Sequence, residues 1–365
     1  MNNFYTANIE MYKYVHQDYE TSDQYADSIL QQAKRNKNSI QIDREDFVLI
    51  TTLLWEPHLL DDSELYKNLF DSFNRKKIKT ILILDSYYKD KNIDGLATKI
   101  YYVNYFLWRT YNKIVRQKKC EFNTEWNSNA DKFLILNGKP GRINRIRLLW
   151  KLESLLFKSI WSLHVHPGTW EESHSCIPEL NVQEFERFVR KYNNNPDRAK
   201  IVFQENSLHY GGIPYDASLF KNSLFRIITE TTFNTDKNTL PWLTEKTFIT
   251  ILNNLPFIMA GDRYSLNKLK KLGFLTFENF LPIPNYDEIE DPEKKLDAIV
   301  TNTEFWINNM KDKEDVKQNV IANYNRINEL ALQNKKILEN ICIEYGIAPH
   351  RIEEICTTYD ILGNE

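Results

Sequence analysis

Residues 224–230 read LFRIITE, and residues 255–261 read LPFIMAG. Both are continuous apolar runs of strand length, which are typical of parallel strands that are covered on both faces. Between them, residues 247–254 have the apolar spacing of a helix, and another helical pattern begins at Tyr264. Strands that alternate with helices predict an α/β fold with a parallel sheet, and ligands bind at the carboxyl edge of such a sheet.

The same alternation extends toward the N-terminus. Residues 46–54 and 78–84 are further buried-strand patterns, and residues 132–136 open a second series with short strand patterns at 160–165 and 200–205. These runs are apolar and bounded by polar segments, so the chain predicts two groups of parallel strands.

Helical patterns occupy much of the remaining chain. The first 45 residues are polar and weakly helical, and a helix pattern fills residues 101–115. The polar, aperiodic segment 120–131 contains the expected domain boundary, and from Pro292 onward the spacing is helical.

A chain of 365 residues exceeds what one core usually serves, so two domains are expected. We place one Rossmann-like α/β domain at residues 1–125 and a second one at residues 126–290. Residues 291–365 are expected to form helices that cross back toward the first domain. Two Rossmann-like domains that face a cleft, followed by a helical C-terminal tail, form a GT-B-like layout.

The composition argues against several classes of protein. The net charge is −3 at pH 7, which does not favour strong non-specific attraction to nucleic acid. No apolar run approaches the roughly 20 residues that a membrane span needs, and the first residues lack the features of a signal peptide. The four cysteines show no Cys-x-x-Cys spacing. We therefore expect reduced thiols in a cytoplasmic protein without a membrane span.

Charged residues gather at the expected edge of the second sheet. Glu230 is the last residue of the apolar run 224–230. Thr244 is placed to cap the next helix, with Glu245 and Lys246 in the first turn of that helix. A capped helix start still has free backbone amides, and these amides favour an anion. Lys246 adds a positive charge suited to a diphosphate, whereas Glu245 should face away from phosphate and accept hydrogen bonds from hydroxyl groups. An ordinary helix start is the competing interpretation.

The order of these elements resembles the donor-binding half of fucosyltransferase-like GT-B enzymes. In that family a glutamate at a strand end precedes a Tyr-x-Thr-Glu-Lys helix start, an apolar strand that contains proline, and a glycine. Residues 269–277, LKKLGFLTF, are also similar to viral and bacterial proteins described as glycosyltransferase-like. The resemblance covers roughly residues 132–285 and does not extend to residues 1–120.

The resemblance implies a metal-independent glycosyltransferase that needs no cofactor and uses a nucleotide-sugar donor of the UDP or GDP type. It would act in the cytoplasm of a bacterium or of a virus-infected cell. By this resemblance, Glu245 would bind the ribose, Lys246 the diphosphate, and Glu230 the donor sugar or nucleotide. The family's Phe-Glu-Asn-Ser is Thr-Glu-Thr-Thr at residues 229–232 here, and Trp242 stands near the family's tyrosine. These departures leave the sugar and the base open.

A loop rich in glycine and arginine follows the first strand of the second series. Residues 137–145 read NGKPGRINR. Backbone amides near Gly138, together with Arg142 or Arg145, could clamp a diphosphate in place of a metal ion. The loop lacks the GxGxxG spacing of dinucleotide-binding folds. Turn glycines beside surface arginines are an equally good interpretation.

The catalytic base is expected from the first domain, because the acceptor hydroxyl must lose a proton as it attacks. Asp85 and Glu56 follow the first two strand patterns, and we rank them ahead of His58. Each of them fits a turn or capping role as well. The acceptor is a hydroxyl of a glycan or lipid, or of a modified base in viral DNA, and a retaining mechanism stays open. DNA would need a basic cleft, for which residues 75–79 and 109–119 are candidates.

Two other functions compete with glycosyl transfer. The chain could bind a nucleotide sugar without catalysis, as a binding or regulatory protein. It could also be a zinc-binding module, because nitrogen and sulfur ligands suit zinc. Four such ligands lie close together, namely His164, His166, His174 and Cys176. Their spacing matches no standard zinc finger, so we expect a polar loop near the nucleotide base and no metal.

Overall fold

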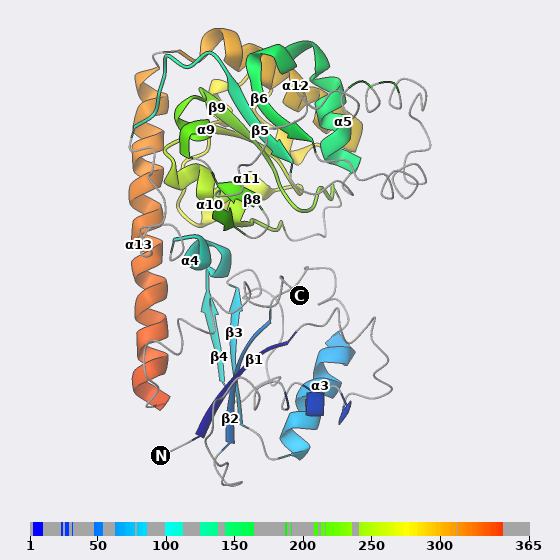
Figure 1. Cartoon of the computed structure of the whole chain (residues 1–365), viewed down its shortest axis with the longest axis vertical. Coiled ribbons are helices and arrows are strands. Elements are labelled where there is room, and N and C mark those ends of the chain that lie inside the picture. Colours follow the sequence, from blue (N-terminus) through cyan, green and yellow to red (C-terminus); the bar gives the residue numbers. More distant parts are fainter. Residues whose placement is uncertain are drawn as a thin grey trace. The chain divides into compact units, whose positions relative to one another are not determined.

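Within the part of the chain that the structure describes, the fold has two four-stranded parallel sheets and one two-stranded antiparallel ribbon (Figure 1). The structure is a computed structural model. It describes residues 3–9, 23–24, 26–28, 31, 47–53, 63–76, 79–85, 99–111, 125–137, 143–163, 187, 191, 208–210, 213–215, 217–235, 241–311 and 313–345. The chain forms two compact units, residues 1–109 with 329–365 and residues 110–328.

The first unit contains a parallel sheet in the order β1-β2-β3-β4. Its strands are β1 (Asn3–Ile9), β2 (Phe47–Leu53), β3 (Lys79–Asp85) and β4 (Lys99–Val103). The helix α3 (Ser63–Arg75) lies between β2 and β3 in the chain, as a parallel connection requires. β2 and β3 confirm the strands that the apolar runs 46–54 and 78–84 predict.

Two expectations for this unit are wrong. Residues 3–9 form a strand, although the sequence predicts weak helix there. Residues 99–103 also form a strand, and the helix α4 (Tyr105–Tyr111) begins only after it. In both cases pairing with a neighbouring strand outweighs the local pattern, since β1 pairs with β2 and β4 pairs with β3.

The second unit contains a parallel sheet in the order β10-β9-β5-β6. Its strands are β5 (Phe133–Asn137), β6 (Ser159–Leu163), β9 (Phe225–Thr229) and β10 (Phe257–Ala260). The ribbon strands are β7 (Leu208–Tyr210) and β8 (Ile213–Tyr215). Every residue of the central strands β5 and β9 is buried. The apolar runs 224–230 and 255–261 therefore form the adjacent parallel strands β9 and β10, as predicted. The strand expected at residues 200–205 lies outside the described residues.

Helices cover both faces of this sheet. They are α5 (Ile143–Lys151), α9 (Ala217–Lys221), α10 (Glu245–Leu252), α11 (Ser265–Lys271) and α12 (Pro292–Asn309), with short 3-10 turns η4 (Glu153–Lys158), η6 (Glu278–Phe280) and η7 (Tyr286–Glu288). Phe225 and Arg226 are neighbours in β9, so their side chains point to opposite faces. Phe225 meets Trp306 of α12 with ring centroids 5.1 Å apart, whereas Arg226 donates to Thr250 of α10 at 3.0 Å. α10 and α12 therefore lie on opposite faces.

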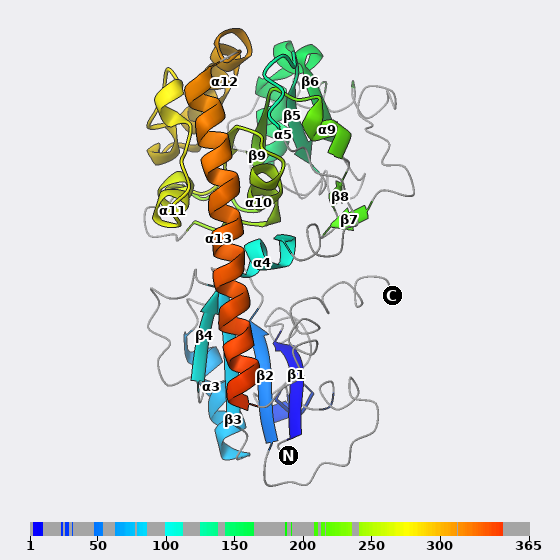
Figure 2. The ribbon, with the colours of Figure 1, turned by 90° about the vertical axis from the view of Figure 1, so that its left-hand side faces the viewer.

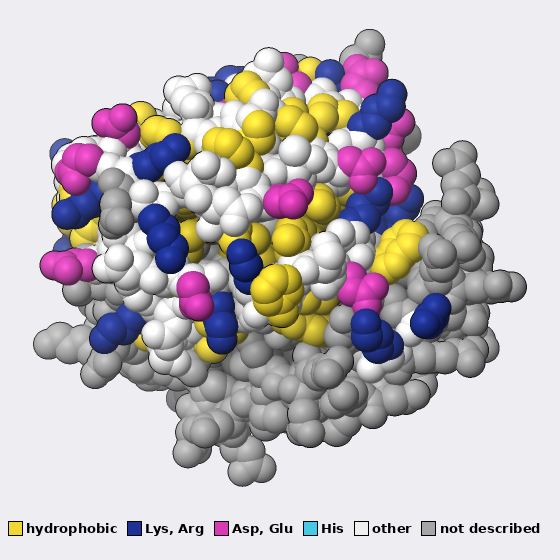
Figure 3. Space-filling model, turned by 90° about the horizontal axis from the view of Figure 1, so that it is seen from above, with side chains coloured by type: hydrophobic (Ala, Val, Ile, Leu, Met, Phe, Trp, Pro, Cys, Tyr) yellow, Lys and Arg dark blue, Asp and Glu magenta, His cyan; other side chains and the backbone are white. Residues whose placement is uncertain are grey.

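Charges of both signs lie on the outer surface. α5 and α12 are joined by ion pairs of Lys151 with Asp297 and of Arg147 with Glu293. On the face seen in Figure 3, Lys and Arg side chains lie among Asp and Glu side chains, with hydrophobic side chains between them. A mixed surface of this kind does not produce a large field of one sign.

One long helix, α13 (Glu314–Tyr345), contributes to both units (Figure 2). In the second unit, Asn323 donates to the Leu275 carbonyl and accepts from the Leu275 N–H, both at 2.7 Å. In the first unit, Asn334 makes the same pair of bonds with the backbone of Asn104, both at 3.2 Å. Each asparagine therefore anchors its own half of α13 to a backbone segment. Among the helices that the structure describes, none is long and apolar enough to cross a membrane.

The two units differ in extent from the expected domains. The division falls between Arg109 and Thr110, whereas the sequence places the first boundary after residue 125. Residues 329–365 group with the first unit, and the earlier part of α13 belongs to the second. The three expected functional domains stay a prediction.

Gly273 follows α11 with a backbone that glycine adopts far more readily than other residues, at φ +86°. A Cβ there would lie 2.6 Å from Nε of Arg326, which itself donates to the Leu272 carbonyl. We expect Gly273→Ala to lower the free energy of unfolding by about 2 kcal/mol, measured by urea denaturation. In an Arg326→Ala background the same change should cost only about 1 kcal/mol, because the backbone strain stays and the clash is gone. An equal cost in both backgrounds would contradict the steric part of this explanation.

Candidate functional site

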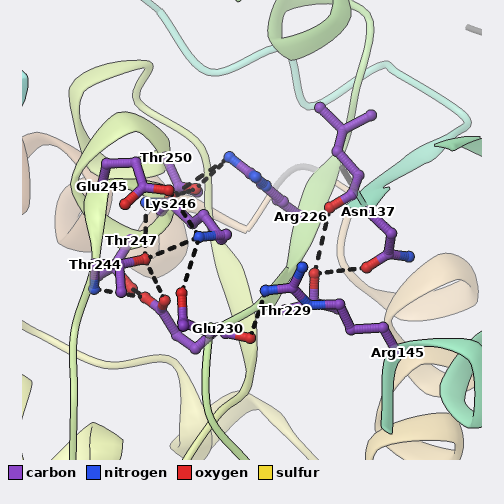
Figure 4. Close-up of polar contacts among 12 residues, drawn as sticks. Asn137, Arg145, Arg226, Thr229, Glu230, Thr244, Glu245, Lys246, Thr247 and Thr250 are labelled. Carbon is purple, nitrogen blue, oxygen red and sulfur yellow. Dashed lines mark hydrogen bonds and ion pairs between the residues drawn. The ribbon is translucent and has the colours of Figure 1, made fainter. Parts of the chain in front are cut away.

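The strand order of the second unit has a topological switch point between β5 and β9. β6 lies on one side of β5, whereas β9 and then β10 lie on the other side. In open parallel α/β sheets, ligands bind outside the carboxyl ends of the strands at such a point. Figure 4 shows the polar residues that gather at and near this edge.

Glu230 follows β9 directly and is fully buried. Its carboxylate accepts hydrogen bonds from the Thr244 N–H at 3.1 Å, from the Thr247 hydroxyl at 2.5 Å and from the Thr244 hydroxyl. All three donors belong to the start of α10 (Figure 4). Glu230 therefore fixes that helix start relative to the sheet, and its oxygens are engaged by the protein itself.

Thr244 is the N-cap of α10, as predicted. Its backbone is extended, at φ −108° and ψ −174°, and its side chain accepts a hydrogen bond from the N–H of Lys246. Every residue of α10 after Glu245 is buried, so the helix is held firmly in place. Backbone N–H groups and the dipole at a helix start favour an anion. At the start of α10 the Glu230 carboxylate is such an anion, because it accepts from the Thr244 N–H.

Lys246 lies in this first turn with its side chain only 8% exposed. Its amine donates to the Glu245 carboxylate at 2.7 Å, to the Thr244 hydroxyl at 3.2 Å and to the Thr231 hydroxyl at 3.3 Å. The sequence predicts that Glu245 turns away from the anion site, whereas the structure pairs it with the amine (Figure 4). Glu245 therefore balances the charge of this amine within the chain itself.

Arg145 reaches the same edge from α5. Its side chain is almost fully buried, and its Nη2 donates to the Glu230 carbonyl at 2.8 Å. This bond links the helix after β5 to the end of β9, across the switch point. The structure thus brings Arg145 together with Glu230, whereas Arg142 and Gly138, predicted for the same loop, lie outside the described residues.

Asn137, the last residue of β5, is a candidate that is not among the residues predicted from the sequence. The Thr229 hydroxyl donates to its Oδ1 at 2.8 Å, and its backbone N–H donates to Ser162 Oγ at 3.0 Å. The residue is 1% exposed, and among the described residues its Nδ2 has no acceptor. A buried donor is costly unless an acceptor meets it, so Asn137 is a candidate ligand contact. Its position at a strand end is the sequence signal that could have found it.

Asp262, just beyond β10, holds the segment that leads to α10. It is 1% exposed and accepts from the Thr232 hydroxyl at 2.6 Å, the Asn234 N–H at 2.7 Å and the Trp242 N–H at 3.0 Å. It thus ties together both ends of the segment between β9 and α10. No local pattern marks Asp262, because its partners are 20 to 30 residues away.

A buried ion pair lies at the carboxyl end of β10. Lys295 of α12 is fully buried, and its Nζ donates to the Gly261 carbonyl at 3.0 Å and to Asp287 Oδ1 at 3.2 Å. Asp287 also accepts from the Leu266 N–H of α11 at 2.8 Å. Burial lowers the pKa of Lys295 and raises the pKa of Asp287, while their mutual attraction opposes both shifts.

Arg226 adds a buried positive charge beneath α10. Its Nη1 donates to Thr250 Oγ1 at 3.0 Å, and its guanidinium lies 5.4 Å from the centroid of the Phe220 ring. Burial lowers the pKa of Arg226 to about 10, and the negative charges of Glu230 and Glu245 oppose that shift. Arg226 is therefore charged at neutral pH and balances carboxylates at the helix start.

Several expected site residues lie where the structure gives no description. They are Glu56, His58, Gly138, Arg142 and the metal candidates His164, His166, His174 and Cys176. Asp85 is the last residue of β3 in the first unit, and only its backbone is described. Within the described part of the chain, no group of three or more His, Cys, Asp or Glu side chains is placed to hold a metal ion.

Comparison of the chain with family models, with curated proteins and with solved structures finds no match. A functional assignment therefore depends on the chemistry of the site. That site combines a capped, buried helix start, a lysine in its first turn and an arginine that spans the switch point.

Proposed function

We propose that this chain is a metal-independent glycosyltransferase that transfers a sugar from a nucleotide-sugar donor to a hydroxyl group. The observation that supports it best is the start of α10, where Lys246 and backbone amides lie at the switch point of a parallel sheet. The proposal includes a GT-B arrangement of two Rossmann-like domains. In it the second domain binds the donor, and the first domain binds the acceptor.

The diphosphate of the donor would bind at the start of α10. There the helix dipole and the ammonium of Lys246 offset its negative charge. On binding, Lys246 exchanges its contact with Glu245 for a phosphate oxygen, and Glu245 becomes an acceptor for the ribose hydroxyls. Arg145 and Asn137 add hydrogen-bond donors from the β5 side of the switch point.

Transfer breaks the bond between the anomeric carbon and the diphosphate oxygen, which keeps the electron pair. The acceptor oxygen forms the new bond to that carbon and gives its proton to a base, for which we propose Asp85 or Glu56. Positive charge around the leaving diphosphate replaces a divalent metal. Glu230 serves as a positioning residue, because its oxygens hold the start of α10.

The donor is proposed to be of the UDP or GDP type, and the acceptor is a hydroxyl of a glycan or lipid, or of a modified base in viral DNA. The resemblance of residues 132–285 to fucosyltransferase-like enzymes and to viral and bacterial glycosyltransferase-like proteins supports this assignment. It also supports a place in the cytoplasm of a bacterium or of a virus-infected cell. The net charge of −3 favours a carbohydrate acceptor over DNA.

Nucleotide binding tests the donor site directly. In a thermal-shift panel of UDP, GDP, CMP and their sugars at about 1 mM, we expect one nucleotide to raise the Tm of the wild type. Lys246→Met keeps the aliphatic stem without the charge, and should weaken that binding by at least about tenfold. Lys271→Met, at an exposed position of α11, is the matched control and should bind like the wild type. No shift with any nucleotide would overturn the donor site.

Turnover separates an enzyme from a binding protein. With the nucleotide identified, Asp85→Asn and Glu56→Gln should both keep donor binding, and at least one should abolish sugar transfer. A wild type that binds the donor but transfers no sugar to a glycan, lipid or DNA acceptor would favour a non-catalytic binding protein. Stoichiometric zinc in the purified protein would instead favour the zinc-binding alternative.

A further inference from the structure

Asn137 differs from other buried asparagines of the second unit. Asn302 and Asn323 each donate through Nδ2 to a backbone carbonyl, at 3.0 Å and 2.7 Å, and each accepts from the N–H of the same backbone residue. Asn137 is 1% exposed, yet within the described part of the chain its Nδ2 meets no acceptor. An unpaired buried donor lowers the stability of a protein, so its presence calls for an explanation.

Thr229 determines which end of the Asn137 amide stays unpaired. Its hydroxyl lies 2.8 Å from Oδ1 of Asn137 and 3.3 Å from the Leu136 carbonyl. A hydroxyl carries one proton, and 2.8 Å is an ordinary O–H···O distance, whereas 3.3 Å exceeds that range. The proton is therefore donated to Oδ1, and this bond turns the Nδ2 of Asn137 away from Thr229.

The unpaired amide lies at the switch point between β5 and β9. The backbone register of these strands covers only the first two residues of each. Toward their carboxyl ends, side chains make the connections. The Thr229 hydroxyl bonds to Asn137, and Arg145 donates to the carbonyl of the next residue, Glu230, at 2.8 Å. The amide and the guanidinium thus meet consecutive residues at the end of β9 (Figure 4).

The charges around this amide favour an anionic acceptor. Arg145 is 3% exposed and lies in the first turn of α5, whose sequence contains no acidic residue. A buried guanidinium and the backbone N–H groups of a helix start both attract an anion. The Glu230 carboxylate does not supply it, because its oxygens accept from the start of α10. A phosphate oxygen would accept from Asn137 and also offset the charge of Arg145.

We propose that Asn137 is a specificity-determining residue of the donor site, and that its Nδ2 donates to a non-bridging phosphate oxygen of a nucleoside diphosphate. Thr229 is a positioning residue, because it fixes the amide without touching the phosphate. This inference rests on the proposed donor site. A site built around a buried hydrogen-bond donor rejects ligands that present a poorer acceptor, since the donor would then stay unpaired.

Two alanine variants separate a ligand contact from a structural role. Asn137→Ala removes the unpaired donor and leaves the Thr229 hydroxyl the Leu136 carbonyl as acceptor, so the ligand-free Tm should stay within about 3 °C of the wild type. Nucleotide affinity, measured by titration calorimetry, should fall at least about tenfold. Asn302→Ala breaks both bonds to Ile283, so it should lower the Tm without changing the affinity. An Asn137→Ala protein with a lowered Tm and normal affinity overturns the proposal.

Two further variants test the direction in which the amide faces. Asn137→Asp keeps the shape and the oxygen that faces Thr229, but it replaces the N–H donor with a second oxygen. It should weaken binding at least as much as Asn137→Ala does. Thr229→Val releases the amide, so it should weaken binding by about threefold in the wild type and have no effect in Asn137→Ala. If Asn137→Asp binds like the wild type, Oδ1 faces the ligand and the proposed contact is refuted.

Phosphorothioate nucleotides test the contact at the level of one atom. Sulfur in place of a non-bridging oxygen is a poorer hydrogen-bond acceptor. At either the α- or the β-phosphate, the wild type should therefore prefer the oxygen form by at least about fivefold. Asn137→Ala should lose most of that preference, because the donor that distinguishes the two atoms is gone. An equal preference in both proteins would show that Asn137 does not contact the phosphate.

Pyrophosphate keeps this test separate from the glycosyltransferase assignment, because it lacks the base and the ribose. If pyrophosphate alone binds, and Asn137→Ala weakens it, the phosphate contact is supported and the nucleotide-sugar donor is excluded. If a nucleotide binds and Lys246→Met weakens it but Asn137→Ala does not, the donor site stands and the role of Asn137 is overturned. A wild type that binds neither pyrophosphate nor any of UDP, GDP and CMP at about 1 mM overturns both.

Discussion

Replacing Glu230 with alanine is expected to lower the free energy of unfolding by about 3 kcal/mol, measured by urea denaturation at pH 7. The buried carboxylate accepts from the Thr244 N–H and from the hydroxyls of Thr244 and Thr247. Alanine leaves these donors at a buried helix start without their acceptor, and each such loss is costly. Glu304→Ala, at an exposed position of α12, is the control and should change stability by less than about 0.5 kcal/mol.

The conservative variant separates a positioning role from direct contact with the donor. Glu230→Gln keeps the shape and one acceptor oxygen, so it should cost only about 1 kcal/mol and preserve nucleotide binding. A Glu230→Gln protein with near-normal stability but without nucleotide binding would place Glu230 in contact with the donor. If Glu230→Ala costs less than about 1 kcal/mol, the buried hydrogen bonds are not what holds the start of α10.

The strands that the sequence predicts most clearly are buried on both faces. All residues of β9 and β10 are buried, and strands of this kind appear as continuous apolar runs. Their environment is therefore encoded in the composition of the segment itself. The N-cap at Thr244 is predictable for a similar reason, because a threonine just before an apolar helical pattern is a local signal.

The sequence does not predict β1 and β4, because strand pairing decides them. β1 contains three polar residues among seven, so its own sequence does not look like a buried strand. It is a strand because all seven residues pair with β2. β4 reads KIYYV and only Asn104 separates it from the helical residues of α4, so local spacing alone suggests one continuous helix. Hydrogen bonding to β3 sets the boundary between strand and helix.

The position of the candidate site is predictable, whereas its internal contacts are not. Parallel strands end at one edge, so Glu230 and the residues around Thr244 are expected close together. The bonds of Glu230, however, join residues 14 and 17 positions apart, and they depend on the path of the intervening loop. The same holds for Asp262, whose partners are 20 to 30 residues away in the sequence.

Lys295→Met is expected to have the largest effect on stability, a loss of about 4 kcal/mol at pH 7. The substitution keeps most of the side-chain volume but leaves the Asp287 carboxylate, only 3% exposed, without its cation. It also removes the donor to the carbonyl of Gly261, the residue directly before Asp262. Lys294→Met, at the preceding exposed position, is the matched control and should change stability by less than about 0.5 kcal/mol.

Removing both charges should cost less than the two single changes together. Asp287→Asn keeps an acceptor for the Leu266 N–H, and in combination with Lys295→Met no buried charge is left without a partner. A double-mutant cycle in urea should therefore show a coupling free energy of roughly 2 kcal/mol. Additive losses would mean that the two side chains stabilise the fold independently.

The stability of Lys295→Met should also depend on pH in a defined direction. Burial raises the pKa of Asp287 above its ordinary value of 3.8, and the charge of Lys295 limits that rise. Without Lys295 the pKa rises further, so the folded chain keeps a proton at pH values where the unfolded chain has lost it. Stability then falls as the pH rises through this window. The difference in unfolding free energy between wild type and Lys295→Met should thus narrow from pH 7 toward pH 4, and a constant difference would show that Asp287 does not titrate in response to its partner.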